Sequence, residues 1–209
     1  MGSLPPAWVT SVLSVARFDR YRVVTSGESD AAIALYAWNV EVSAAFVVPL
    51  HWAEMAFRNV LHARLAGHYG RADWWVAAPL DQNGHRKVGE AQAMLRRLGK
   101  NPTIADSVVA ELSLGFWVSL LAKHYSRTLW VPLLWRCFPG RSRLDVHTDY
   151  KHVLFLRNRI SHGEPIHRRH LAADHAAVCR LLGELSPQAL HLARPHDQVP
   201  AVLARRPTP

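Results

Sequence analysis

The sequence predicts an all-α protein with a single folded domain. Apolar residues recur at spacings of three and four along nearly every ordered stretch, which is the period of an amphipathic helix. No stretch shows the alternation of polar and apolar residues, bounded by hairpin turns, that is typical of strands. The chain has 209 residues, 49% hydrophobic and 20% charged, which suits one domain with a substantial core.

The expected helices follow one another with short connections. A first helix covers about 7–19, and a second begins after Ser26 and reaches Pro49, where we expect a kink or a restart. The second helix then continues to about 66 and stops at Gly67 or Gly70. The remaining helices are expected at 81–98, 103–112, 114–124, 126–135, 142–162 and 167–185, with a short element at 73–75.

These elements divide the chain into three parts. Residues 1–27 form an N-terminal segment with a short helix, and residues 28–190 form the helical domain. Residues 191–209 are expected to be a flexible, proline-rich tail.

The charge balance indicates a polyanionic partner. Lysine and arginine exceed aspartate and glutamate by nine, and the pI is about 10.2. Nucleic acid is the first candidate and an anionic membrane surface the second. A basic composition inherited from an arginine-rich genome is the alternative explanation.

Several classes of function lack their signatures. The sequence has no P-loop, no dinucleotide-binding glycine pattern, no HExxH and no GxSxG, so we expect no cofactor. The start of the chain does not resemble a signal peptide. The longest apolar stretch, 31–57, is interrupted by Asn39, Glu41, Pro49, His51 and Glu54, so we expect a soluble cytoplasmic protein without a membrane partner.

The end of the 142–162 helix carries residues suited to a phosphodiester. Arg157 falls in the middle of an apolar stripe, where an unpaired charge costs desolvation energy. His162 arrives where Gly163 ends the helix, and Asn158 shares a helix face with it. A cation, an amide and an imidazole can together grip and cleave a phosphodiester. The alternative is a structural arginine with a histidine that caps the helix end.

Glu54 is the expected partner of Arg157. It lies at the centre of the apolar stripe of the second helix, so each charge faces the interior and needs the other. The competing explanation is a local ion pair between Glu54 and Arg58, four residues later.

The spacing within the motif predicts a symmetric dimer. Arg157 and His162 are five residues apart, roughly 140° around the helix, so they point to different sides. If both act on one phosphate, two copies of the helix must face each other.

A basic stretch follows the motif. We expect Arg159, His167, Arg168 and Arg169 to contact RNA phosphates, and a solvated helix start is the alternative. Compact metal-ligand spacing is absent among the histidines at 162, 167, 170 and 175 and between the two cysteines. We therefore expect no metal site. The tryptophans are expected in the core rather than stacked on bases.

The motif R-N-x-x-x-H at 157–162 resembles that of the HEPN superfamily of all-α ribonucleases. More closely, the chain resembles the Abi-like (abortive infection) branch of that superfamily. The segments that carry the resemblance cover most of 30–190: they are 36–39, 43–46, 54–59, 74–75, 109–117, 129–130, 138–139 and 156–166. Where many relatives have Ala-His-His, this chain has Ser161-His162-Gly163, a change that leaves the motif histidine in place.

The resemblance implies a HEPN-like helical bundle with additional helices, a dimer and metal-independent RNA cleavage. It implies that Arg157 and His162 are catalytic with Asn158 as their polar partner, and we expect Glu54, Arg58 and Asn59 to orient them. Attack by the RNA 2′-hydroxyl, with the imidazole in proton transfer and the guanidinium on the phosphorane, is the mechanism these residues support. The expected role is phage defence or a toxin held by an antitoxin, and a non-catalytic RNA-binding or regulatory module is the alternative.

Overall fold

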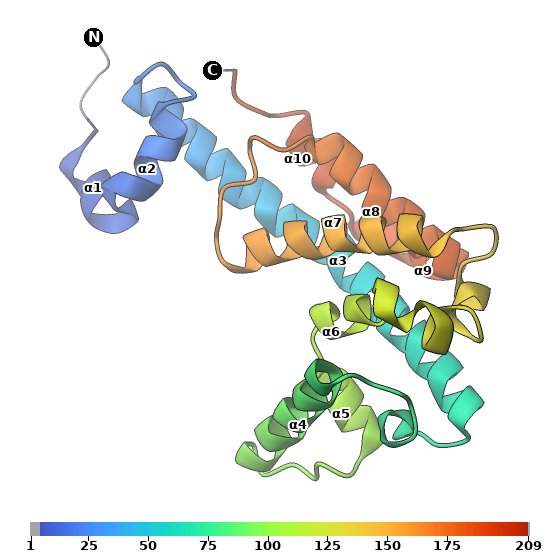
Figure 1. Cartoon of the computed structure of the whole chain (residues 1–209). Coiled ribbons are helices and arrows are strands. Elements are labelled where there is room, and N and C mark those ends of the chain that lie inside the picture. The colour runs from blue at the N-terminus through green and yellow to red at the C-terminus, as the bar shows by residue number, and fades with distance from the viewer. Residues whose placement is uncertain (1–4, 209) are drawn as a thin grey trace.

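One long helix runs through the molecule, and the other elements pack along it (Figure 1). The computed structural model describes residues 5–208. Helix α3, Ser29–Tyr69, has 41 residues and is therefore about 60 Å long. It continues through the buried Pro49 without the restart that we considered, and it ends where Gly70 adopts a left-handed φ of +67°.

The N-terminal elements pack on the first part of α3. Helices α1, Ala7–Leu13, and α2, Val15–Arg22, replace the single helix expected over 7–19. The chain breaks between them at Ser14, which has a positive φ of 62°. Phe18 and Tyr21 of α2 are buried against the rest of the protein.

A second group of short elements lies at the opposite end of α3 (Figure 1). Its regular helices are α4, α5 and α6, and Asp81 caps the first by accepting a hydrogen bond from the Gly84 amide at 2.7 Å. Trp74 and Trp117 are fully buried here, as expected for core tryptophans. The chain then forms a 3-10 turn, a π-helical turn over 126–130 and a second 3-10 turn, in place of the expected regular helix at 126–135. The bounds are η1 Trp74–Val76, α4 Gln82–Arg97, α5 Ala105–Glu111, α6 Leu114–Ser119, η2 Lys123–Tyr125, η3 Ser126–Trp130 and η4 Leu134–Cys137.

Helices α7, Arg143–Ser161, and α8, Leu171–Leu185, pack beside the middle of α3. Of all the elements, α8 makes the most extensive contact with α3. Ser142 caps α7 by accepting a hydrogen bond from the Asp145 amide at 3.2 Å.

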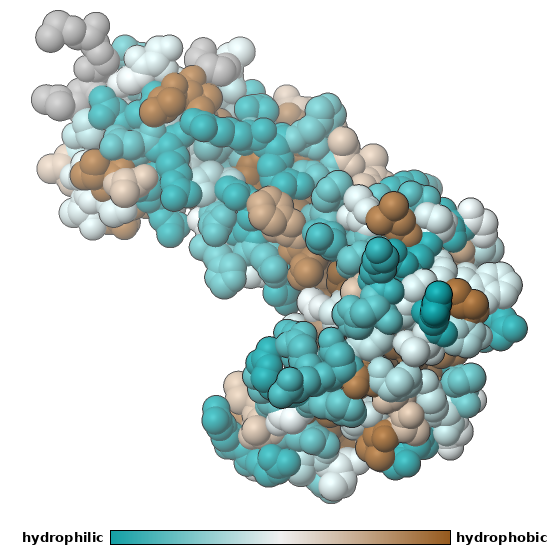
Figure 2. All heavy atoms as spheres, viewed as in Figure 1, coloured by the Kyte–Doolittle hydropathy of each residue, from teal (hydrophilic) through white to brown (hydrophobic). Residues whose placement is uncertain are grey.

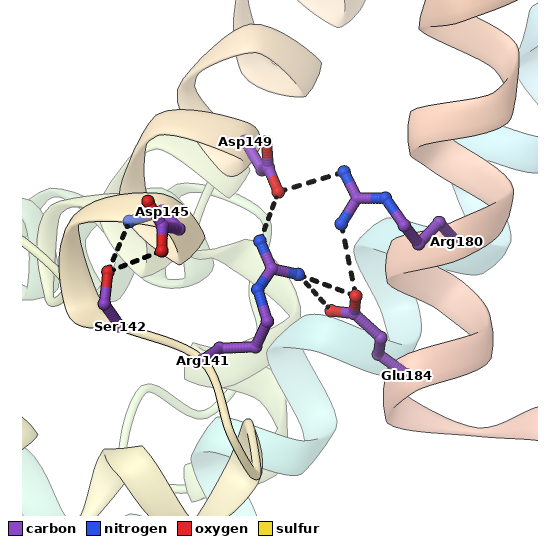
Figure 3. Close-up of polar contacts among 6 residues, drawn as sticks. All are labelled: Arg141, Ser142, Asp145, Asp149, Arg180 and Glu184. Carbon is purple, nitrogen blue, oxygen red and sulfur yellow. Dashed lines mark hydrogen bonds and ion pairs between the residues drawn. The ribbon is translucent and has the colours of Figure 1, made fainter.

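Four charged side chains join the start of α7 to α8 (Figure 3). Arg141 lies 2.6 Å from both Asp149 and Glu184, and Arg180 lies 3.0 and 3.1 Å from the same two carboxylates. Positive and negative groups alternate around this ring, so each charge has two partners. Burial alone would raise the pKa of the Asp149 carboxyl, but hydrogen bonds from the two arginines lower it below its ordinary value.

The C-terminal segment corrects the expectation of a flexible tail. Residues 187–203 form α9, Pro187–Ala193, η5, Arg194–His196, and α10, Val199–Leu203. Val202 is buried, and its carbonyl accepts a hydrogen bond from the Trp38 indole of α3 at 2.9 Å. Pro187, Pro195 and Pro200 occupy the first turns of these elements, where the missing N–H is not needed.

The protein is therefore all-α and forms a single domain, and residues 5–208 contain no strand. Figure 2 shows a mostly hydrophilic face with hydrophobic residues in small, separate patches. By length and composition alone, α3 meets the criterion for a membrane-spanning helix, which core helices of soluble proteins also meet.

Candidate functional site

The motif residues lie at the C-terminal end of α7. Asn158 and His162 are exposed, while Arg157 is half-buried. His162 directly follows the last residue of α7, and its amide donates to the Asn158 carbonyl at 3.0 Å. Gly163 then takes a positive φ of 61°, which turns the chain away from the helix axis. The imidazole is thus presented to solvent at a defined helix end.

Arg157 and Glu54 meet across the contact between α7 and α3. The Arg157 Nε atom lies 3.4 Å from Glu54 Oε2. The side chains are 36% and 17% exposed, so the pair is less buried than we expected. Arg58 instead donates to Asn59 Oδ1 at 3.1 Å. Glu54 therefore anchors the guanidinium while leaving part of it accessible.

His162 lines an open cavity of about 380 Å³ between the end of α7 and helix α2. Arg17 and Arg20 of α2 line the same cavity, and Arg17 Nη1 donates to the Gly163 carbonyl at 3.0 Å. Neither arginine was predicted from the sequence to belong to the site. No local pattern marks them, because their place beside the motif depends on contacts between residues more than 140 positions apart. Arg157 does not line this cavity.

A second basic cavity of about 420 Å³ adjoins the first and shares Arg20 and Pro165 with it. Arg159, Arg168 and Arg169, which we expected to bind RNA, all line it. Ion pairs with Glu164, at 3.1 Å, and Asp174, at 2.7 Å, partly neutralise Arg159 and Arg169, and both guanidinium groups lie over the ring of Phe155. The most exposed of the three is Arg168. The two cavities together form a basic surface beside His162.

His167 corrects the expected RNA contacts, because it is only 1% exposed. Its ring packs on that of Tyr21 with centroids 4.7 Å apart, and its amide donates to Asn39 Oδ1 at 3.0 Å. Burial, followed by the nearby Arg168 and Arg206, lowers its pKa to about 4. Neither ring nitrogen has a hydrogen-bond partner within residues 5–208. A neutral, buried imidazole does not bind a phosphate from solvent.

A further group of chemically active side chains lies on α8 and the C-terminal segment. His175, Cys179 and Asp197 place one possible ligand atom each within 4.8 Å of one another. The pair of His175 and Cys179 was not predicted, because neither the histidines among themselves nor the cysteines among themselves show metal-ligand spacing. Their separation of four residues on one helix was the available signal.

No protein-family model, no curated protein and no solved structure matches the chain.

Proposed function

We propose that this protein is a metal-independent endoribonuclease of the HEPN type, from the Abi-like branch, that acts in the cytoplasm as a homodimer. The observation that carries this proposal is the end of α7. There an exposed His162 lies in an open, arginine-lined cavity, and Arg157 is anchored by Glu54 but still accessible. A histidine with only a structural role at a helix end does not require this basic surrounding.

The proposed reaction uses the nucleophile that RNA itself carries. The 2′-hydroxyl attacks the neighbouring phosphorus and loses its proton to an imidazole, which ordinarily exchanges protons near neutral pH. The bond from phosphorus to the 5′-oxygen breaks, and that oxygen takes up a proton. His162 serves the proton transfer, Arg157 stabilises the negative charge of the phosphorane, and Asn158 binds a phosphate oxygen. The products are a 2′,3′-cyclic phosphate and a 5′-hydroxyl.

The basic surface gives the RNA strand a path to His162. Arg17 and Arg20 line the cavity next to the imidazole, and Arg168 extends the positive charge into the adjoining cavity. Phosphate contacts of this kind position a strand without reading its sequence. We therefore expect binding that weakens steeply as salt concentration rises.

A second copy of the chain completes the site in this proposal. Arg157 does not line the cavity that holds His162, which favours a site to which two chains contribute. Leu144 and Phe155 of α7 are 62% and 52% exposed, which suits a helix that packs against its symmetry mate. The imidazole of the second copy is then available to protonate the leaving oxygen.

The proposal is tested by cleavage of an oligoribonucleotide and of the same sequence with 2′-deoxy sugars, both in the presence of EDTA. The wild-type protein is expected to cleave only the RNA and to leave a cyclic phosphate. The variants His162→Ala and Arg157→Ala are each expected to lose at least about 100-fold in rate, the usual contribution of a proton-transfer or charge-stabilising group.

The matched control is His85→Ala, because His85 is an exposed histidine on α4 at the other end of the molecule. It is expected to cleave at the wild-type rate. Equal cleavage of the deoxy substrate, or full activity in His162→Ala, contradicts the proposed mechanism.

A non-catalytic RNA-binding or regulatory module is the second candidate. It is favoured by the absence of Arg157 from the cavity that holds His162. This candidate predicts RNA binding that does not change in His162→Ala, with no product from any RNA.

A role of the nuclease as a toxin or in phage defence, held by an antitoxin, has its own test. Expression of the protein alone should slow growth, and Arg157→Ala should abolish that effect.

A further inference from the structure

The side chains of His175, Cys179 and Asp197 converge at the junction of α8 with the C-terminal segment. His175 and Cys179 lie one turn apart on the same face of α8, with Cys179 Sγ 3.4 Å from His175 Nε2. Asp197 follows η5 and places its Oδ2 atom 2.5 Å from the same His175 Nε2 and 3.9 Å from the sulfur. All three residues are half-buried.

We propose that His175, Cys179 and Asp197 bind a zinc ion, with water as the fourth ligand. Nitrogen, sulfur and carboxylate oxygen are the donor atoms that zinc takes in proteins. With the usual bond lengths, a tetrahedral zinc site separates its ligand atoms by about 3.4 to 3.6 Å. The distances from the sulfur are already within about 0.4 Å of these values, and the imidazole and carboxylate need to separate by only about 1 Å.

The charges at this site balance around a divalent ion. A thiolate and a carboxylate contribute two negative charges, the neutral imidazole contributes none, and zinc brings the sum to zero. This matters because Asp197 and His175 are only 10% and 18% exposed, and an unbalanced charge is costly there. The remaining exposure leaves access for the water ligand.

The position of Asp197 does not depend on the metal. Its second oxygen, Oδ1, accepts a hydrogen bond from the amide of Val199, the first residue of α10, at 3.0 Å. The backbone that carries the carboxylate is therefore already fixed beside α8. A preorganised ligand loses little conformational entropy on binding, which favours affinity.

A nucleophilic triad is the competing interpretation of a cysteine, a histidine and an aspartate. In such a triad the histidine uses one ring nitrogen for the nucleophile and the other for the carboxylate. Here His175 Nε2 contacts both partners. The thiol and the carboxylate both approach the same ring nitrogen, an arrangement that suits a shared metal ion better than a proton relay.

The zinc would join α8 to the segment that packs on α3. Beyond Asp197, Val202 accepts the hydrogen bond from Trp38, and Arg206 donates to the His167 carbonyl at 3.0 Å. Removal of the metal is therefore expected to loosen the C-terminal segment. The inference does not depend on the proposed nuclease activity.

The test is direct metal binding by the full chain. Purified protein is stripped with a chelator and titrated with zinc against a competing indicator, and then with cobalt. We expect one zinc per chain and, with cobalt, thiolate charge-transfer absorption in the near ultraviolet together with the intense visible bands of a tetrahedral site. The variant Cys179→Ser should lose the charge-transfer band and at least about 10-fold in zinc affinity.

The matched control is Cys137→Ser, which removes the other free, half-buried cysteine and should bind as the wild type does. Asp197→Asn provides a second test, because the amide oxygen can still accept the hydrogen bond from Val199 and so preserve the fold while zinc binding weakens. Far-ultraviolet circular dichroism checks the fold of each variant. Equal zinc affinities for Cys137→Ser and Cys179→Ser, or cobalt spectra without thiolate absorption, overturn the proposal.

Discussion

The two ends of α7 both carry arginines and acidic partners, but they use them differently. At the start of the helix, Arg141 and Arg180 each contact two carboxylates at 2.6 to 3.1 Å (Figure 3). At the far end, Arg157 has a single contact of 3.4 Å with Glu54. The first arrangement satisfies its charges within the protein, whereas the second leaves guanidinium donors for a ligand.

The difference suggests a division of work along one helix. A ring of mutually satisfied charges holds α7 against α8 and stabilises the fold. Incompletely paired arginines beside an exposed histidine contribute little to stability, and their charge is available for binding. Each end should therefore respond to mutation and to pH in its own way.

The largest expected effect is a pH dependence of the free energy of unfolding, caused by His167, which follows α7 in the chain. Its pKa is lowered from 6.5 to about 4, so the unfolded chain takes up the proton first and stability falls as pH drops from 6.5 towards 4. The loss should be about 2 kcal/mol between pH 7 and pH 5, and about 3 kcal/mol at pH 4. Urea unfolding at several pH values measures it.

The variant His167→Phe isolates this contribution, because it keeps a ring against Tyr21 but cannot take up a proton. Its free energy of unfolding should change less with pH over that range. The four charged side chains between α7 and α8 should affect the free energy of unfolding only at lower pH. The reason is that the pKa of Asp149 lies below its ordinary value of 3.8. A wild-type curve that is flat from pH 7 to pH 5 is incompatible with this account.

The next effect compares the two arginines. Arg141→Ala removes contacts to two carboxylates from a side chain only 23% exposed, so unfolding should become easier by about 2 kcal/mol. Arg157→Ala removes one longer contact and should cost less than about 1 kcal/mol. Chemical denaturation measures both variants.

Arg180 contacts the same two carboxylates but is more exposed, so it serves as the control. Arg180→Ala should lower the free energy of unfolding by less than Arg141→Ala. RNA cleavage should show the reverse order, with Arg157→Ala impaired and Arg141→Ala close to wild type at a temperature where both are folded. Equal destabilisation by Arg141→Ala and Arg157→Ala removes the contrast between the two ends.

The smallest effect concerns the serines that flank α7. Ser142→Ala removes the hydrogen bond to the Asp145 amide and should lower the free energy of unfolding by about 1 kcal/mol. Ser161 only bonds back to the Arg157 carbonyl at an exposed position, so Ser161→Ala should change it by less than about 0.5 kcal/mol. Thermal unfolding compares the two, and a larger loss for Ser161→Ala reverses the assignment.

Local patterns predicted the parts of the protein that depend on local chemistry. Ser142 marked the start of α7, and two charges on apolar stripes correctly pointed to the contact between Glu54 and Arg157. Arg17 and His167 were not predictable in this way. Arg17 reaches the motif only through long-range packing, and His167 becomes buried only through long-range packing.

The C-terminal segment was missed for a different reason. Proline disfavours the interior of a helix but suits its first turn, and composition alone does not distinguish the two. Three short elements begin at or near Pro187, Pro195 and Pro200.

The order of α3 and α8 along the chain has a consequence for synthesis on the ribosome. The apolar α3 leaves the exit tunnel long before α8, its main packing partner, because residues 70–170 are translated between them. At about 5 to 20 residues per second, the interval lasts on the order of 5 to 20 seconds. During that time the nascent chain exposes a surface that chaperones bind, so the yield of folded protein should depend on chaperone supply and translation speed.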